Sequence, residues 1–316
     1  MKILANDGIS KSGIDALESA GFEVSTTTVA QEQLINYINE NNITVLLVRS
    51  ATTVRKDLID ACPSLKIIGR GGVGMDNIDV DYAREKGLKV INTPAASSHS
   101  VGELVFGHFY GIARFLHNAN RDMPLEGDTN FKGLKKAYAK GIELKGKTLG
   151  VLGFGRIGQA TAKIALGAGM KVVAYDPYME KANLKLDFFD GQSVDFNITT
   201  ISKEDVLKQS DFISLHVPAQ KEYIIDDAEF NIMKDGVIIA NAARGGVLNE
   251  VALVKAIESG KVTGAALDVF ENEPKPELQL LMNSSLSLTP HIGAATNEAQ
   301  DRIGTELATQ IKEILL

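Results

Sequence analysis

The chain has 316 residues, of which 44% are hydrophobic and 23% charged, and its formal net charge is −7. These values are typical of a globular protein with one large domain or two ordinary ones, and the acidic balance argues against a nucleic acid partner. No apolar run reaches the ~20 residues of a membrane helix, and "MKILANDGIS" turns polar too early for a signal peptide. The single cysteine, Cys62, excludes an intramolecular disulfide and has no neighbouring thiol or histidine to hold a metal. We therefore expect a cytoplasmic protein without a metal site.

The first ninety or so residues alternate short apolar runs with amphipathic stretches. We predict strands at residues 2–7, 22–27, 43–48, 65–69 and 88–94. We predict helices between them, at residues 10–21, 31–42, 55–61 and 79–87. Strands that alternate with helices pair in parallel, because the helical crossovers cover both faces of the sheet. This part of the chain is therefore predicted to form one α/β unit.

A long helical pattern follows the polar stretch "AASSHS" and covers residues 101–123. Ser98 or Ser100 could cap this helix, and Glu103 would complete a capping box with Ser100. Residues 124–143 form a lysine-rich connection, which is typical of a solvated face. The apolar residues that recur at roughly helical spacing are Leu104, Val105, Phe109, Ile112 and Phe115.

A second α/β series begins at Lys147 and supports a prediction of two units. Its strands are expected at residues 147–153, 171–176, 211–217, 236–243 and 262–270, with a helix at 156–169 after the first. A last helix is expected at 296–316. The fold class is accordingly α/β, with two doubly wound parallel-sheet domains.

The segment "GVLGFGRIGQ" places Gly153, Gly155 and Gly158 between a strand and a helix. In that context G-x-G-x-x-G predicts a loop whose backbone approaches a pyrophosphate at the helix N-terminus. Asp176 ends the next strand, where a carboxylate binds the adenosine ribose and favours NAD over NADP. The alternatives are a structural glycine turn with a surface aspartate, or another nucleotide-like ligand such as S-adenosylmethionine.

Four polar residues follow predicted strands further along the chain: Arg244, Asp268, Glu273 and His291. Oxidation of a hydroxyl group requires a base such as neutral imidazole, a carboxylate that supports the imidazolium, and a cation at the substrate carboxylate. Each residue alone has an ordinary structural explanation, for example a rim salt bridge for Arg244 or a turn before Pro274 for Glu273. Their joint place at strand ends, after a dinucleotide loop, favours catalysis.

Together these motifs resemble the D-isomer-specific 2-hydroxyacid dehydrogenases. The similarity extends to "LHVP", "NAARGGVL", "ALDVFENEP", "TPHIGAAT", "VRSAT" and "GRGGVGMDNIDV" and covers nearly the whole chain. It implies a Rossmann NAD domain at residues 98–289, inserted in a flavodoxin-like substrate domain of residues 1–97 and 290–316. It also implies a homodimer through the cofactor domain, with 101–123 as a contact.

The resemblance assigns roles to residues by motif. Arg244, Glu273 and His291 would be the catalytic group, and Asp268 would bind the nicotinamide carboxamide. Substrate contacts would come from Arg49, Ser50, Val73 and Gly74. The residues implied for the cofactor are Gly153, Gly155, Arg156, Ile157, Gly158, Asp176, His216, Val217, Ala242, Ala243, Arg244, Asp268, His291, Gly293 and Ala294.

Within the family the similarity is nearest to phosphoglycerate dehydrogenases of the short kind. This implies oxidation of 3-phospho-D-glycerate, at the entry to serine biosynthesis, with domain closure around the substrate. The alternatives are a glyoxylate or hydroxypyruvate reductase, another D-2-hydroxyacid dehydrogenase, or an NAD-sensing binding protein on the same fold. Since 25 residues follow His291 (316 − 291) and a regulatory domain needs ~50 or more, we expect no serine feedback through an appended C-terminal domain.

The chain also departs from the family pattern. It has no Trp before "ELKGKTLG", and it carries Asn249 where many relatives have Asp. The lysine-rich connection replaces the Trp segment, and its Lys132, Lys135 and Lys136 could reach a phosphate, although a solvated face is the simpler interpretation. Neither departure falls on Arg244, Glu273 or His291.

Overall fold

The computed structural model describes all 316 residues, and the chain divides into two compact units. Unit 1 comprises Met1–Ser100 with Ala294–Leu316, and unit 2 comprises Val101–Gly293. The crossings thus fall at 100/101 and 293/294, where the sequence predicted 97/98 and 289/290. None of the helices combines the length and the apolarity that crossing a membrane requires.

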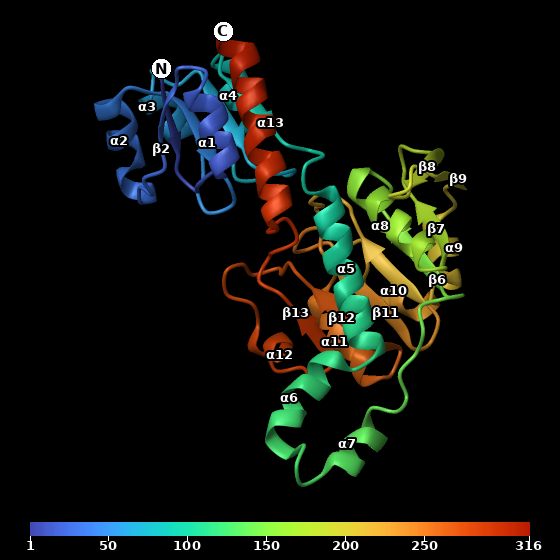
Figure 1. Cartoon of the computed structure of the whole chain (residues 1–316). Helices are drawn as coiled ribbons and strands as arrows, with labels where there is room; N and C mark the ends of the chain where they lie inside the picture. Colours follow the sequence, from blue (N-terminus) through green and yellow to red (C-terminus); the bar gives the residue numbers. More distant parts are fainter. The chain divides into compact units, whose positions relative to one another are not determined.

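Unit 1 is a five-stranded parallel sheet in the order β2-β1-β3-β4-β5, with helices between its strands (Figure 1). This is the strand order of flavodoxin-like folds, as the resemblance implied. Helix α13 (Asn297–Leu315) packs against α1 (Lys11–Glu18), where a side chain at Gly13 would lie 2.8 Å from the Gly304 backbone. The other elements are β1 Lys2–Ala5, β2 Glu23–Ser25, the 3-10 helix η1 Gln31–Gln33, α2 Leu34–Asn41, β3 Ile43–Val48, α3 Lys56–Ala61, β4 Ile67–Arg70, α4 Val80–Glu85 and β5 Lys89–Asn92.

Both faces of this sheet are buried, because successive side chains of a strand point to opposite faces. In β3, Val45 and Leu47 join one apolar cluster, together with Ile303 of α13. Their neighbours Leu46 and Val48 join a second cluster on the other face. The near-continuous apolar strands are therefore the consequence of parallel pairing with helices on both sides.

Unit 2 contains a six-stranded parallel sheet in the order β13-β12-β11-β10-β6-β7, again with helices around it (Figure 1). The order reverses between β10 and β6, and ligands of such sheets bind beyond the carboxyl ends of strands near that point. The elements are β6 Thr148–Leu152, α8 Arg156–Gly167, β7 Lys171–Tyr175, α9 Lys203–Gln209, β10 Phe212–Leu215, α10 Asp227–Ile232, β11 Val237–Asn241, α11 Glu250–Glu258, β12 Val262–Leu267, α12 Leu278–Leu281 and β13 Leu286–Leu288.

An antiparallel hairpin, which we did not predict, follows β7. Its strands β8 (Lys181–Asp187) and β9 (Ser193–Thr199) pair only with each other. Leu184 on its inner side is fully buried in the unit 2 core. The alternation of apolar and polar residues in "KANLKLD" and the "DG" turn at 190–191 were signals for this hairpin.

The predicted helix over 101–123 is wrong as a single element. The structure has α5 (Ser98–Ala113) and α6 (Leu116–Glu126), separated at Phe115, whose φ of 57° breaks the helix. The capping prediction is also wrong, because Ser100 and Glu103 lie inside α5. The lysine-rich connection contains a short helix, α7 (Phe131–Ala137), which exposes its lysines to solvent.

Candidate active site

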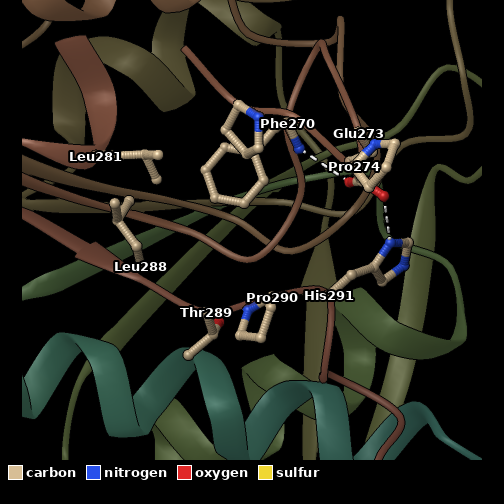
Figure 2. Close-up of a pocket in the computed structure, with 9 residues that line it drawn as sticks. Phe270, Glu273, Pro274, Leu281, Leu288, Thr289, Pro290 and His291 are labelled. Carbon is tan, nitrogen blue, oxygen red and sulfur yellow. Dashed lines mark hydrogen bonds and ion pairs between the residues drawn. The ribbon is translucent and has the colours of Figure 1, made fainter. Parts of the chain in front are cut away.

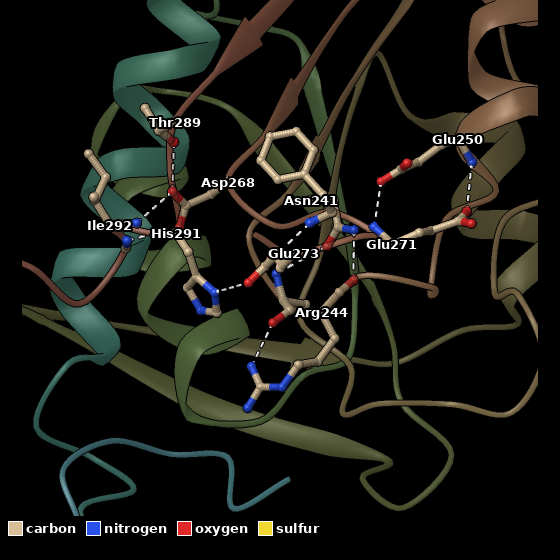
Figure 3. Close-up of polar contacts among 12 residues, drawn as sticks. Asn241, Arg244, Glu250, Asp268, Glu271, Glu273, Thr289, His291 and Ile292 are labelled. Atoms are coloured by element: carbon tan, nitrogen blue, oxygen red, sulfur yellow. Dashed lines mark hydrogen bonds and ion pairs between the residues drawn. The ribbon is translucent and has the colours of Figure 1, made fainter. Parts of the chain in front are cut away.

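Arg244, Glu273 and His291 follow three neighbouring strands of the unit 2 sheet. Strands β11, β12 and β13 are adjacent and parallel, so their carboxyl ends meet at one edge. The three residues follow these strands within a few positions. The structure therefore brings the three predicted catalytic residues to one place, as Figure 3 shows.

His291 and Glu273 form a hydrogen-bonded pair. The His291 Nδ1 lies 2.9 Å from the Glu273 Oε2, and both side chains are more than a third exposed. The other carboxylate oxygen accepts the Phe270 N–H at 3.0 Å, so the acid is held at both oxygens. This arrangement orients the imidazole and leaves Nε2 as the ring nitrogen for a substrate proton.

The loop that carries Arg244 is shaped by Asn241 at the end of β11. The Asn241 amide donates to the Arg244 carbonyl at 2.9 Å, and its oxygen accepts the Ala243 N–H at 3.1 Å. The Arg244 Nη1 donates to the Ala243 carbonyl at 2.6 Å. A side chain at Gly245 would lie 1.8 Å from the Phe270 carbonyl oxygen, so only glycine permits this approach. The close contact joins the Arg244 loop to the segment that carries Glu273.

A reciprocal pair of glutamates fixes the same segment to α11. The Glu250 carboxylate accepts the Glu271 N–H at 2.8 Å, and the Glu271 carboxylate accepts the Glu250 N–H at 3.1 Å. Burial is the largest effect and raises the pKa of Glu250, while the hydrogen bond from the Glu271 N–H acts in the opposite direction. Figure 3 shows these bonds beside Glu273. The sequence analysis did not find this clamp, because it depends on a contact between residues that lie 21 positions apart in the chain.

Asp268, the predicted carboxamide partner, is buried and makes three internal hydrogen bonds. Its carboxylate accepts the Thr289 hydroxyl at 2.6 Å and the backbone N–H groups of Ile292 and Gly293, each at 2.8 Å (Figure 3). Asp268 therefore holds the turn that contains His291. Its contact with a nicotinamide stays a prediction.

An apolar pocket of about 420 Å³ adjoins the histidine–glutamate pair (Figure 2). Its walls are mostly proline, leucine and phenylalanine side chains, with the pair as its main polar groups. The lining includes Phe270, Glu273, Pro274, Leu281, Leu288 and His291. The site thus combines a polar pair with an apolar surface.

The glycine loop has the geometry that a dinucleotide requires. Gly153 has a φ of 90°, and a side chain there would lie 2.5 Å from the His216 carbonyl oxygen. A side chain at Gly158 would lie 2.1 Å from the Gly153 carbonyl oxygen, which explains the close packing of α8 on β6. At Gly155, directly before Arg156 and Ile157, nothing lies within 4 Å. The loop therefore leaves open space at a helix N-terminus for a pyrophosphate.

Asp176 lies at the end of β7 beside that loop. Its carboxylate accepts the Phe154 N–H at 2.7 Å and the Tyr178 N–H at 2.9 Å. Both oxygens retain a lone pair that ribose hydroxyls could use. His216 and Val217 follow β10, and Ala242 and Ala243 follow β11, so these predicted cofactor residues lie at strand ends of the same sheet.

The predicted substrate residues lie in unit 1. Asp7 accepts hydrogen bonds from the Arg49 N–H at 2.6 Å and from the Thr52 side chain, which orders the loop that carries Arg49 and Ser50. Burial lowers the pKa of Arg49, with the charge of Asp7 acting in the opposite direction. The roles of Arg49, Ser50, Val73 and Gly74 stay predictions, and Ala294 also belongs to unit 1.

Arg70 is a further cation of unit 1 that the sequence analysis missed. A side chain at Gly72 would lie 1.6 Å from the Arg70 Nη1, so this guanidinium lies over the glycine loop. The Arg49 Cγ would lie 3.7 Å from a side chain at neighbouring Gly71. The "GRGG" segment, an arginine directly before a glycine loop, was the available signal.

Three comparisons place the chain among known proteins. Residues 106–293 match the family model "D-isomer specific 2-hydroxyacid dehydrogenase, NAD binding domain". The chain is 44% identical to hydroxypyruvate reductase of Thermotoga maritima, over 98% of this chain and 97% of that one. It is 42% identical to D-3-phosphoglycerate dehydrogenase of Methanocaldococcus jannaschii, and that match covers 100% of this chain and 57% of that enzyme.

A solved structure agrees with these matches. D-lactate dehydrogenase from Aquifex aeolicus, complexed with NAD and lactic acid, matches with a TM-score of 0.76 and 28% identity. The match covers 100% of this chain and 95% of that one. The glycine loop and the acid after β7 lie within the matched residues and fit the NAD-binding domain that the family model describes. The chain belongs to the NAD-dependent D-isomer-specific 2-hydroxyacid dehydrogenases.

Proposed function

We propose that the protein oxidises 3-phospho-D-glycerate to 3-phosphohydroxypyruvate with NAD, the first step of serine biosynthesis. The observation that carries the chemistry is the hydrogen-bonded His291–Glu273 pair beside Arg244 at three adjacent strand ends. The phosphate preference rests on two features. Arg49 and Arg70 each approach the glycine loop of unit 1, and several relatives are phosphoglycerate dehydrogenases.

His291 acts as the general base in this proposal. Its Nε2 accepts the proton of the C2 hydroxyl, and Glu273 supports the imidazolium through Nδ1. Bound NAD would accept the hydrogen of C2 as a hydride, which leaves a carbonyl group. Arg244 would hold the substrate carboxylate and polarise the developing carbonyl, since a guanidinium makes paired contacts with a carboxylate.

Replacement of the base tests this assignment. His291→Ala should lower kcat by roughly 10²-fold or more, the contribution of general-base catalysis, with NADH binding retained. Glu273→Gln should give a smaller loss, because the amide can keep one hydrogen bond to the ring. Near-normal turnover by His291→Ala would refute the assignment.

Reduction of hydroxypyruvate or glyoxylate is the second candidate. The 44% identity to hydroxypyruvate reductase of Thermotoga maritima, over nearly the full length of both chains, favours it. The two candidates share the catalytic group and differ in whether a phosphate contributes to binding. A non-enzymatic NAD sensor is a third possibility, and measurable turnover with any of these substrates would exclude it.

A substrate panel decides between the candidates. The assay follows NADH formation with 3-phosphoglycerate, D-glycerate and D-lactate, and NADH consumption with phosphohydroxypyruvate, hydroxypyruvate and glyoxylate. We expect a kcat/KM at least ~10²-fold higher for the phosphorylated member of each pair, the effect of about two charge-assisted contacts. An equal or higher value for hydroxypyruvate would establish the reductase instead.

Arginine variants localise the phosphate contact. Arg49→Gln and Arg70→Gln should raise KM for the phosphorylated substrate by roughly tenfold each and leave KM for hydroxypyruvate within about twofold. Arg84→Gln, on the exposed side of α4 (Val80–Glu85), is the matched control and should change neither. Equal losses on both substrates would place these arginines at the carboxylate and not at a phosphate.

We also propose a homodimer through the cofactor unit. Helix α6 has no buried residue, and Leu116, Met123, Leu125 and Phe131 of α6 and α7 are exposed. An apolar surface of this kind on helices with little core favours a second copy as partner. Light scattering should give a dimer for the wild type and a monomer for the double variant Leu125→Glu, Phe131→Glu. A monomeric wild type would refute the proposal.

A further inference from the structure

A chain of hydrogen bonds runs from α5 to the turn that carries His291. His108, in α5, is buried, and its Nδ1 lies 2.7 Å from the Ser287 Oγ. Its Nε2 lies 3.1 Å from the Thr289 Oγ1. The Thr289 hydroxyl continues to the buried Asp268 carboxylate at 2.6 Å. None of these bonds is made by a residue of the glycine loop or by His291 or Glu273 itself.

The direction of these bonds follows from the groups involved. A carboxylate only accepts, so Thr289 donates its single proton to Asp268. The Thr289 oxygen can then only accept from the ring, which places the proton of neutral His108 on Nε2. Nδ1 in turn accepts the Ser287 proton. Burial, the largest effect, lowers the pKa of His108 and agrees with a neutral ring, although the charge of Asp268 acts against it.

The far end of the chain of bonds is the turn itself. Asp268 accepts the N–H groups of Ile292 and Gly293, the two residues directly after His291. His291 has a φ of 55°, a left-handed conformation that is strained for a residue other than glycine. External hydrogen bonds must hold such a conformation, and an error of ~1 Å in the position of a base can lower turnover by ~10²-fold.

We infer that His108 is a positioning residue for His291, which acts through Thr289 and Asp268. The ring of His108 fixes the Thr289 hydroxyl, the hydroxyl fixes the Asp268 carboxylate, and the carboxylate holds the left-handed turn. The catalytic meaning of this inference rests on the proposed role of His291. The structural link can be measured without turnover.

Amide exchange in the unliganded full-length protein measures the link directly. Peptides covering residues 286–294 are followed by mass spectrometry in His108→Leu, His108→Gln, Thr289→Val and the double variant His108→Leu, Thr289→Val. We expect roughly tenfold faster exchange of these amides in His108→Leu and at least as much in Thr289→Val. His108→Gln should stay within about threefold of the wild type, because its amide can replace the Nε2 donor. Thr200→Val, at a hydroxyl that bonds the Met179 carbonyl, is the control.

The double variant separates a linked chain from two independent effects. If His108 acts only through Thr289, the double variant should exchange no faster than Thr289→Val alone. In the kinetic assay, His108→Leu should lower kcat by about tenfold with KM for NAD within about twofold, and His108→Gln should restore kcat. If His108→Leu does not fold, Thr289→Val and His108→Gln still test the link.

Three results would overturn the inference. The first is an unchanged amide exchange rate of residues 286–294 in His108→Leu or Thr289→Val. The second is an increase in the double variant equal to the product of the two single increases. The third is exchange as fast in His108→Gln as in His108→Leu. A wild type that turns over no 2-hydroxy acid would refute the proposed function alone. The exchange result would still decide whether His108 holds the turn.

Discussion

Gly245 shows how a single residue without a side chain can join two segments of the candidate active site. The close approach of its Cα to the Phe270 carbonyl leaves no space for a methyl group, whose carbon would lie 1.8 Å from the oxygen. Gly245→Ala should therefore displace either the Arg244 loop or the segment before Glu273. We expect a loss of kcat of roughly 10²-fold or more, in steady-state assays.

The control for Gly245→Ala is Gly107→Ala, in the exposed middle of α5. Nothing lies within 4 Å of a side chain at Gly107, and alanine favours a helix over glycine. This variant should gain about 0.5–1 kcal/mol of unfolding free energy without loss of activity. A fully active Gly245→Ala would mean that the loop can shift without effect on the site.

His216 makes stability depend on pH. Its ring Nδ1 is buried without a hydrogen-bond partner, and burial lowers the pKa of His216 to about 3, against about 6.5 when unfolded. The folded state thus holds the neutral ring. The contribution of His216 to the free energy of unfolding is fully present above pH 6.5 and is lost as the pH falls toward 3. In that range the imidazole binds a proton in the unfolded state but not in the folded state, which favours unfolding.

The predicted size of this effect is about 2 kcal/mol between pH 7 and pH 5. Urea unfolding at both pH values measures the free energy of unfolding. From pH 7 to pH 5 this free energy should fall by that amount more in the wild type than in His216→Gln. The glutamine keeps a polar group near the Ser214 hydroxyl. Equal losses in the two proteins would mean that the ring can bind a proton in the folded state.

At the scale of elements, the β8–β9 hairpin is part of the unit 2 core although it pairs with no other strand. Leu184→Ala should lower the free energy of unfolding by about 2–5 kcal/mol, since it removes a fully buried side chain. Val194→Ala, on the exposed side of the same hairpin, should change it by less than about 0.5 kcal/mol. Similar effects of the two substitutions in urea unfolding would show that the hairpin does not pack on the core.

The elements also show where sequence patterns succeed. Runs such as 43–48 and 236–243 were predicted as strands because both faces of a parallel sheet are buried, which leaves a continuous apolar run. The break at Phe115 carries no glycine or proline as a signal, so the helix appeared continuous. Strand β13 has only three residues, and we assigned its segment no element although "TPHIGAAT" was recognised directly after it.

At the scale of the whole molecule, each unit has apolar clusters of its own. Two clusters lie in unit 1 and two in unit 2. We therefore expect two thermal transitions in calorimetry. Because the glycine loop and Asp176 belong to unit 2, NADH at ~100 times its Kd should stabilise one transition by about 2.7 kcal/mol.

A core variant in each unit assigns the transitions. Leu46→Ala, in unit 1, should lower the midpoint temperature of the transition that NADH leaves unchanged. Leu149→Ala, in unit 2, should lower the midpoint temperature of the transition that NADH raises. One transition that both variants and NADH shift together would show that the units unfold as one.

The sequence by itself determined the α/β class, the two series of strands, the glycine loop with its acid, and the residues proposed for catalysis. These are local signals: periodicity, glycine spacing and the position of polar residues after strands. Only the tertiary structure decided the order of the strands, and with it the meeting of Arg244, Glu273 and His291 at one edge of a sheet. The same holds for the glutamate clamp, for Arg70 over its glycine loop and for the bonds from His108 to Asp268. Each of these joins groups through space, and the distance between such groups is set by packing and not by their separation in the chain.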